Sequence, residues 1–172
     1  QSVRWTEDGR GVRIIDQRLL PGKLVERDLR SLAEVSDAIR TLAVRGAPAI
    51  GIAGAMGLVA VLAPNESKSH DQLMAEARRV AAEIASTRPT AVNLAWALDR
   101  VLRAAAASPR TGAAMIDAMN REASAILDED RAMCRRIGEH GVTLLQDGAR
   151  VLTHCNAGAL ATGGIGTALA PI

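Results

Sequence analysis

The stretch RGAPAIG, which begins at Arg45, combines residue types that favour anion binding. Ala47 precedes a proline and is therefore biased toward extended backbone, which suits the cap of a helix that begins at Pro48. The first amides of such a helix, from Ala49 onward, lack intrahelical acceptors and carry the positive end of the helix dipole. Gly46 would let a ligand approach the backbone, and Arg45 would add a delocalised positive charge. Arg45, Gly46 and Ala47 can thus form a cradle for a phosphate or a sugar phosphate.

The same stretch has a second interpretation. Gly51, Gly54 and Gly57 lie roughly on one face of the expected helix, where glycines allow a neighbouring helix to approach closely. Arg45 would then be an ordinary surface residue. The residues alone support both interpretations equally.

A second arginine lies in STRPT, residues 86–90, at a break between two expected helices. An arginine in such a loop is usually exposed and has no further role. Arg88 gains interest only as a second ligand for a phosphate bound near Arg45.

A thiol follows the apolar run RVLTHC, residues 150–155, which is typical of a buried strand. Doubly wound α/β folds bind their ligands at the carboxyl ends of such strands, and Cys155 falls there. His154 and Cys155 would point to opposite faces of the strand, so no Cys-His pair is expected between them. Asn156, Ala157 and Gly158 begin a loop whose amides could face an anion. Cys155 could equally be a small buried apolar residue.

The glycines that follow do not complete a known phosphate loop. No Gly-Lys-Ser/Thr is present, and GGIGTAL has Leu169 where a GxGxxG motif needs its last glycine. Other polar or sulfur-bearing residues have structural interpretations. Cys134, Met115, Met119 and Met133 are expected in the core, Asp99 beside a neighbouring arginine, and His140 near a helix C-terminus.

Composition excludes several function classes. The 172 residues carry a net charge of +2, and the two Trp residues are the only aromatic side chains besides histidine. Dispersed arginines and few aromatics argue against nucleic-acid binding. The two cysteines form neither a disulfide framework nor a metal-ligand motif. The charge-free run Ala47–Ala63 falls short of the roughly 20 residues of a membrane span, and the polar start is no secretory signal. We expect a cytoplasmic protein with no metal and no membrane or nucleic-acid partner.

The pattern along the chain predicts the elements that must position these residues. SVRW and GVRIIDQRLLP flank an Asp-Gly hairpin turn, and residues 24–29 add a third short strand, giving a small antiparallel sheet. Capping boxes at Ser31 with Glu34 and at Ser69 with Gln72 begin helices. Thr90 is the expected cap of the next helix, and a long helical pattern covers residues 111–145.

The character of the sequence changes near residue 147. Residues 1–146 are predicted to form a mostly helical domain with the small sheet, and residues 147–172 to begin a doubly wound, Rossmann-like α/β domain. The expected fold class is therefore α/β. A parallel strand needs neighbours and covered faces, so we interpret this sequence as part of a longer protein. The alternative is that the strand over 150–155 joins the N-terminal sheet.

Three stretches together resemble one family. AIRTLAVRGAPAIGIAGAMGL, RPTAVNLAWALDR and IGEHG followed by LLQDGARVLTHCNAGALATGGIGTAL occur in the order and spacing found in methylthioribose-1-phosphate isomerases. These enzymes are related to ribose-1,5-bisphosphate isomerases and to regulatory subunits of the translation-initiation guanine-exchange factor. The resemblance covers essentially all of this chain and about the first half of the family's length.

The resemblance implies a conversion of 5-methylthioribose 1-phosphate to 5-methylthioribulose 1-phosphate in methionine salvage, with no metal or other cofactor. It implies substrate binding by Arg45, Gly46, Ala47 and Arg88, and participation of Cys155 in the reaction. It also implies a homodimer formed through the C-terminal domain. The family's acid/base aspartate has no match in residues 1–172, so we expect this chain alone to be inactive.

Two other functions stay open on the sequence. Ribose-1,5-bisphosphate isomerase differs in the 5-substituent, and its second phosphate would require further cations. A non-catalytic subunit that senses sugar phosphates or nucleotides would need no acid/base aspartate. The sequence also leaves open whether hydrogen moves from C2 to C1 as a proton or as a hydride.

Overall fold

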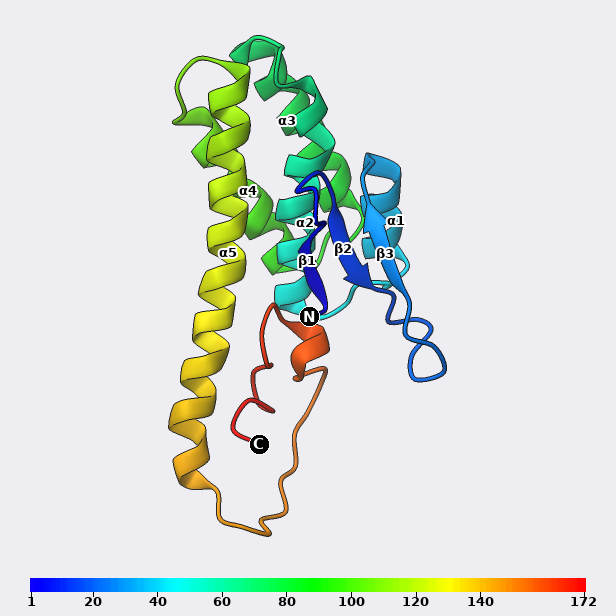
Figure 1. Ribbon diagram of the computed structural model, residues 1–172, viewed down its shortest axis with the longest axis vertical. Coiled ribbons are helices and arrows are strands. Elements are labelled where there is room, and N and C mark those ends of the chain that lie inside the picture. Colours follow the sequence, from blue (N-terminus) through cyan, green and yellow to red (C-terminus); the bar gives the residue numbers. More distant parts are fainter.

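The computed structural model describes residues 1–172 and has an α/β fold in which helices pack around one central helix (Figure 1). The elements are β1 (Val3–Trp5), β2 (Val12–Ile15), β3 (Glu26–Leu29), α1 (Leu32–Arg40), α2 (Ala47–Leu62), α3 (His70–Ser86), α4 (Val92–Ala106) and α5 (Gly112–Gly141). Short 3₁₀ turns cover Ala63–Asn65, Val142–Leu144 and Ala159–Ala161. Helix α5 runs along nearly the whole length of the molecule, beside α4 and α2.

The predicted small sheet is confirmed. Its three strands are antiparallel in the order β1-β2-β3, with Val3 opposite Ile14 and Val12 opposite Leu29. These four side chains are buried and form the face of the sheet that contributes to the core. The Asp-Gly turn lies between β1 and β2, where Gly9 has a φ of 66°, a left-handed value that glycine adopts at little cost.

Helix α2 is the centre of the core and packs against α1, α3, α4, α5 and the sheet. Its glycines serve packing, because a Cβ on Gly51 would lie 2.9 Å from the Asn93 carbonyl oxygen and one on Gly57 would lie 2.7 Å from Val35 Cγ1. The sequence analysis judged this run too short to span a membrane. Together with the following 3₁₀ turn, Ala47–Asn65 is long and apolar enough, but 72% of its most apolar window is buried in the protein. The segment is therefore the core helix of this fold.

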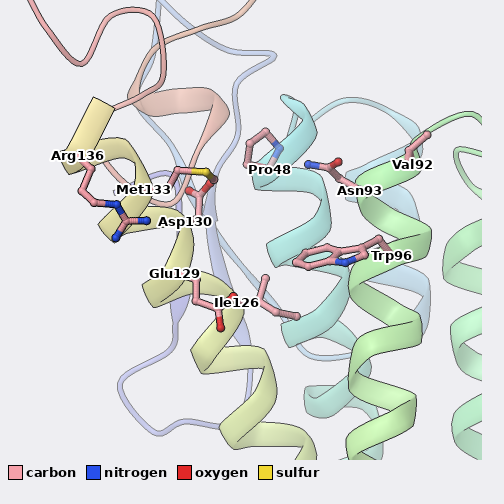
Figure 2. A pocket seen from close by; sticks show the side chains of 9 residues that line it. All are labelled: Pro48, Val92, Asn93, Trp96, Ile126, Glu129, Asp130, Met133 and Arg136. Carbon is pink, nitrogen blue, oxygen red and sulfur yellow. The ribbon is translucent and has the colours of Figure 1, made fainter. Parts of the chain in front are cut away.

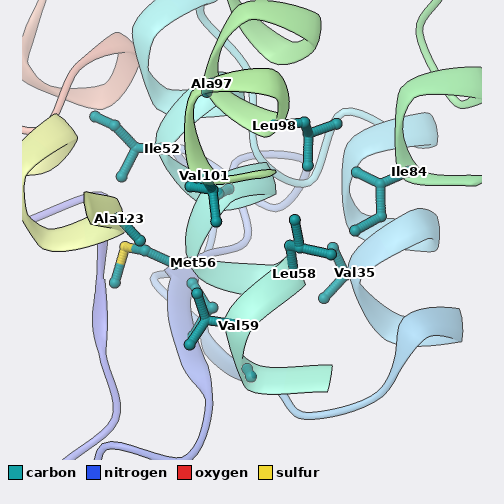
Figure 3. Packing of buried hydrophobic residues seen from close by; sticks show 14 of the residues in the cluster. Val35, Ile52, Met56, Leu58, Val59, Ile84, Ala97, Leu98, Val101 and Ala123 are labelled. Carbon is teal, nitrogen blue, oxygen red and sulfur yellow. The ribbon is translucent and has the colours of Figure 1, made fainter. Parts of the chain in front are cut away.

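Branched aliphatic and methionine side chains fill the space around α2. Figure 3 shows Ile52, Met56, Leu58 and Val59 of α2 meeting side chains of α1, α3, α4 and α5. Met115 and Met119 are also fully buried, as predicted, and so is Cys134.

Two of the three helix caps predicted from a Ser or Thr side chain are confirmed. Ser31 with Glu34 and Ser69 with Gln72 form complete capping boxes before α1 and α3. The predicted cap at Thr90 is wrong, because the N-cap of α4 is Ala91. Residues 88–91 form a turn closed by the Ala91 amide and the Arg88 carbonyl, which are 2.9 Å apart, and this turn delays the helix.

The segment after α5 differs from the prediction. Residues 150–155 form no strand, and residues 146–156 are all exposed, so the predicted buried strand is wrong for this structure. A strand exists only by pairing, and no strand of the N-terminal sheet lies beside this segment. The alternative addition to that sheet is therefore also wrong. After this exposed stretch the chain returns to the lower end of α2, where Ala161, Thr162 and Gly163 are buried (Figure 1). The proposed domain boundary at residue 147 stays a prediction.

Candidate functional site

Three separate segments line one open cavity of about 910 Å³. Arg45, Gly46 and Ala47 come from the start of α2, and Arg88 comes from the turn between α3 and α4. Cys155, Asn156 and Ala157 come from the segment after α5, together with His154 and Thr167. The remaining lining residues are Leu42, Pro48, Ile50, Ala91 and Ala168. Gly158 does not line the cavity and instead forms an isolated bridge with Gly166.

The cavity lining contains two arginines and no carboxylate. Neither Arg45 nor Arg88 forms an ion pair, whereas other arginines of the chain, such as Arg4 and Arg13, bind carboxylates at 2.6 Å. Unpaired guanidinium groups beside a cavity without negative charge favour an anionic ligand.

The start of α2 adds backbone donors to this cavity. The N-cap of α2 is Gly46, one residue before the predicted cap, and it supplies no side-chain acceptor. The first helical hydrogen bond runs from the Ile50 amide to the Gly46 carbonyl, so the amides of Ala47 and Ala49 have no helical acceptor. No acidic side chain lies in the first turn to neutralise the helix dipole. The arrangement suits a phosphate at this end of α2.

Gly46 has a backbone conformation that only glycine adopts readily. Its φ is 104°, and an added Cβ would lie 2.4 Å from Ala161 Cα. The Arg45 loop and the returning C-terminal segment can therefore pack tightly at this point only because position 46 lacks a side chain.

The Cys155 loop also differs from an extended strand. Cys155 is exposed and has a φ of 68°, which breaks the alternation expected for a strand. His154 and Cys155 consequently line the same cavity, and the expectation that they face opposite sides is wrong. The amides of Asn156, Ala157 and Gly158 donate to no backbone acceptor, while the Ala157 carbonyl accepts from the Thr167 amide at 3.0 Å.

One polar residue beside the cavity was not singled out by the sequence analysis. Gln17 follows β2, is only 1% exposed, and accepts a hydrogen bond from Arg45 Nε at 3.3 Å. Its side-chain amide donates to the Leu160 carbonyl at 2.8 Å. The signal was a polar Asp-Gln pair directly after an apolar strand, which alone does not point to a site.

A second cavity of about 590 Å³ shares Pro48 with the first in its lining. Figure 2 shows Trp96 and Asn93 from α4 facing Ile126, Asp130 and Met133 from α5. Met133 is 46% exposed, so its predicted place in the core is wrong. The prediction that Asp99 pairs with an arginine is confirmed, at 3.3 Å from Arg103.

Asp130 is a buried acid at the edge of this second cavity. Its Oδ2 accepts the Gly163 amide at 2.7 Å, and burial raises the pKa of the Asp130 carboxyl above its ordinary value. Burial likewise raises the pKa of the neighbouring Cys134 thiol. No group of three or more His, Cys, Asp or Glu side chains has the geometry of a metal site.

The chain is similar to enzymes that isomerise sugar 1-phosphates. It is 55% identical over 172 residues to a methylthioribose-1-phosphate isomerase from Gemmatimonas aurantiaca, a match that covers 99% of this chain and 49% of that protein. It is 54% identical to a 5-deoxyribose 1-phosphate isomerase from Moorella thermoacetica, over 99% of this chain and 48% of that protein. The chain thus spans about half the length of these curated relatives.

Solved structures agree with this fold. The 5-methylthioribose 1-phosphate isomerase from Pyrococcus horikoshii OT3 superposes with a TM-score of 0.90 at 35% identity, over 99% of this chain and 47% of that one. The delta subunit of translation initiation factor eIF-2B from A. fulgidus gives a TM-score of 0.88 at 43% identity, over 98% of this chain and 48% of that one. A model of the initiation factor 2 subunit family matches residues 43–171, and the chain therefore belongs to that family.

Proposed function

We propose that the protein containing this chain is an aldose-ketose isomerase that converts 5-methylthioribose 1-phosphate to 5-methylthioribulose 1-phosphate in methionine salvage. The observation that supports this most directly is the cavity that unpaired Arg45 and Arg88 share with Cys155, without any carboxylate. The names of the similar enzymes supply the substrate class.

The substrate's phosphate would lie between the two arginines and the first amides of α2. In this placement C1, which bears the phosphate, would lie in the cavity that Cys155 also lines. Arginine suits this task because its planar group can bind two phosphate oxygens at once.

The reaction needs no external oxidant or reductant. The bond between C1 and the ring oxygen breaks, the hydrogen on C2 moves to C1, and the C2 hydroxyl loses its proton to become a carbonyl. The ring oxygen gains a proton, so the atoms balance within the substrate. Cys155 would either donate a proton or polarise the developing charge on oxygen. A second acid/base group is required, and we propose that a carboxylate outside residues 1–172 supplies it.

The test uses the full-length protein encoded by the gene, in an assay of ketose formation. Cys155→Ala should lower kcat at least about a hundredfold, as expected for loss of an acid/base group. Cys134→Ala removes the other thiol and should keep activity, because Cys134 is buried away from the cavity. Full activity of Cys155→Ala would remove the thiol from the mechanism.

Substrate binding is tested separately. Arg45→Ala and Arg88→Ala should each raise KM about tenfold or more, since a hydrogen bond to a charged group is worth roughly 1.5–3 kcal/mol. Unchanged KM values for both variants would contradict the proposed phosphate site. Ribose 1,5-bisphosphate as a competing substrate tests the alternative 5-substituent. Arg45 and Arg88 are the only lysine or arginine side chains that line the cavity, so a second phosphate should be disfavoured.

A regulatory subunit is the second candidate function. The similarity to a delta subunit of initiation factor eIF-2B favours it. Calorimetry with the sugar phosphate, followed by a turnover assay, separates the two functions. Binding without turnover by the full-length protein would support the regulator.

We also propose the finer features that the resemblance implies. These are a Rossmann-like domain that begins near residue 147, a homodimer formed through that domain, a cytoplasmic location, no cofactor, and no membrane or nucleic-acid partner. Residues 1–172 alone should be inactive, which a turnover assay of this chain checks directly.

A further inference from the structure

We propose that Gln17 is a positioning residue that orients the Arg45 guanidinium and joins the Arg45 loop to the segment bearing Cys155. The proposal rests on the proposed function only in assigning Arg45 to the substrate phosphate. Gln17 does not line the cavity and would act through Arg45.

Gln17 joins three parts of the chain by four hydrogen bonds. Its backbone amide donates to the Ala43 carbonyl at 2.9 Å. Its side-chain oxygen accepts from Arg45 Nε at 3.3 Å, and its side-chain nitrogen donates to the Arg45 carbonyl at 3.5 Å and to the Leu160 carbonyl at 2.8 Å. The end of β2, the loop before α2 and the C-terminal segment therefore meet at this one side chain.

The chemistry of these contacts requires an amide. Arg45 Nε can only donate and the Leu160 carbonyl can only accept, so the side chain between them must offer both an acceptor and a donor. Only one orientation of the Gln17 amide satisfies both groups. A carboxylate at this position could not donate, and an apolar side chain would leave both partners unsatisfied in a site that is 1% exposed.

The neighbouring residue holds the backbone of Gln17 in place. Asp16 is buried and binds Arg18 at 2.5 Å, and this contact lowers the pKa of Asp16 to about 2. Its amide donates to the Val25 carbonyl at 2.8 Å. Gln17 thus lies in a hydrogen-bonded turn after β2, whereas Arg45 lies in the loop before α2 and is exposed.

The orientation of the Arg45 guanidinium matters for ligand binding. Its hydrogen bond to Gln17 uses Nε and leaves the two terminal nitrogens of Arg45 free for a ligand. A guanidinium fixed at Nε presents its other edge to a phosphate without first losing side-chain freedom on binding. Arg88 has no such partner among the side chains around it, so the two arginines of the cavity should differ in rigidity before ligand binds.

The main experiment is a double-mutant cycle in the full-length protein with Gln17→Met and Arg45→Ala. The readouts are KM and kcat for 5-methylthioribose 1-phosphate and the Kd of inorganic phosphate by calorimetry. Gln17→Met should raise both the KM for the substrate and the Kd of phosphate about tenfold, with little change in kcat. In the Arg45→Ala background, Gln17→Met should have less than about a twofold further effect on either value. Gln146→Met, at an exposed position, is the matched control and should leave all values unchanged.

Equal tenfold effects of Gln17→Met in both backgrounds would overturn the proposal, because Gln17 would then not act through Arg45. A wild-type protein that binds phosphate but makes no ketose would contradict the proposed function. The phosphate Kd values of the double-mutant cycle would then still test whether Gln17 acts through Arg45.

A measurement on the unmutated protein covers the case in which Gln17→Met does not fold. In phosphate-free buffer, the Nε proton of Arg45 should exchange with water at least about fivefold more slowly than that of Arg88, as measured by NMR with Arg→Lys variants for assignment. Equal exchange rates would contradict the hydrogen bond and with it the positioning role.

Discussion

At the scale of single residues, charged groups without an ion-pair partner lie in and near the cavity. Arg45 and Arg88 face the cavity without ion pairs. Asp130 lies nearby, is 6% exposed, and has one backbone donor and no cation. Because desolvation dominates there, the charged form of this carboxyl is disfavoured in the folded protein.

We therefore predict that Asp130→Asn stabilises the protein at neutral pH. The asparagine oxygen can still accept the Gly163 amide, and the substitution removes a buried charge. The pKa of Asp130 is raised on folding, so its contribution is favourable below the unfolded pKa and is lost as pH rises through the folded pKa. The gain in unfolding free energy over wild type should therefore grow as pH rises through that window.

Urea unfolding between pH 4 and pH 8 measures this difference. Asp128→Asn is the control, because Asp128 is an exposed acid on the same helix and pairs with Arg131. It should show no such increase with pH. A pH-independent difference between Asp130→Asn and wild type would contradict the prediction.

At the scale of elements, the junction between Gly46 and Ala161 fixes how the start of α2 meets the C-terminal segment. Gly46 has a φ of 104°, and a Cβ added at this position would lie 2.4 Å from Ala161 Cα. Ala161 is itself only 1% exposed.

We predict that Gly46→Ala lowers the free energy of unfolding by at least about 1 kcal/mol, since a strained backbone alone costs roughly 1–3 kcal/mol. It should also raise KM, because the Arg45 loop would shift. Gly22→Ala is the control, as Gly22 has an ordinary φ and its added Cβ would lie 3.5 Å from the Leu19 carbonyl oxygen. Denaturant titration should place this control within about 0.5 kcal/mol of wild type. Equal stabilities of the two variants would contradict the junction's importance.

Elements fixed by local hydrogen bonds were mostly predicted correctly from the sequence, whereas an element that depends on distant contacts was not. The two capping boxes and the Asp-Gly turn were found because their hydrogen bonds join residues only a few positions apart. Thr90 failed as a cap because the preceding turn competes for the same residues. The strand at 150–155 failed because a strand depends on partners that no local pattern reveals.

The residues of the candidate site show the same difference between local motifs and distant contacts. Arg45, Arg88 and Cys155 were recognised from family motifs, and the structure brings them to one cavity. Their roles in substrate binding and reaction stay predictions. Gln17 was missed because its importance comes from contacts with Arg45 and with Leu160, 143 residues away in sequence.

At the scale of the whole molecule, the exposed residues 146–156 connect α5 to the C-terminal segment, in which Ala161, Thr162 and Gly163 are buried. This stretch leaves the lower end of α5 and runs outside the core before the chain returns to α2 (Figure 1). Exposed backbone with few internal hydrogen bonds is open to proteases.

We predict that trypsin cleaves the 172-residue chain first after Arg150, which is exposed in this stretch. A bound sugar phosphate should slow that cleavage, because His154 to Ala157 line the cavity and would be ordered by the ligand. Mass spectrometry of a digestion time course identifies the first product. Arg150→Gln should remove it, and an earlier cut within α5 would contradict the prediction.

The cavity also depends on contacts between the two ends of the sequence. Ser2 Oγ donates to the Thr162 carbonyl at 2.7 Å, a separation of 160 residues, and Gln17 reaches Leu160. The entropy of closing so large a loop must be overcome before these bonds can form, which makes them late events in folding. During synthesis Ser2 and Gln17 leave the ribosome well before their partners Thr162 and Leu160. A nascent chain can therefore form the core around α2 before the C-terminal segment completes the cavity.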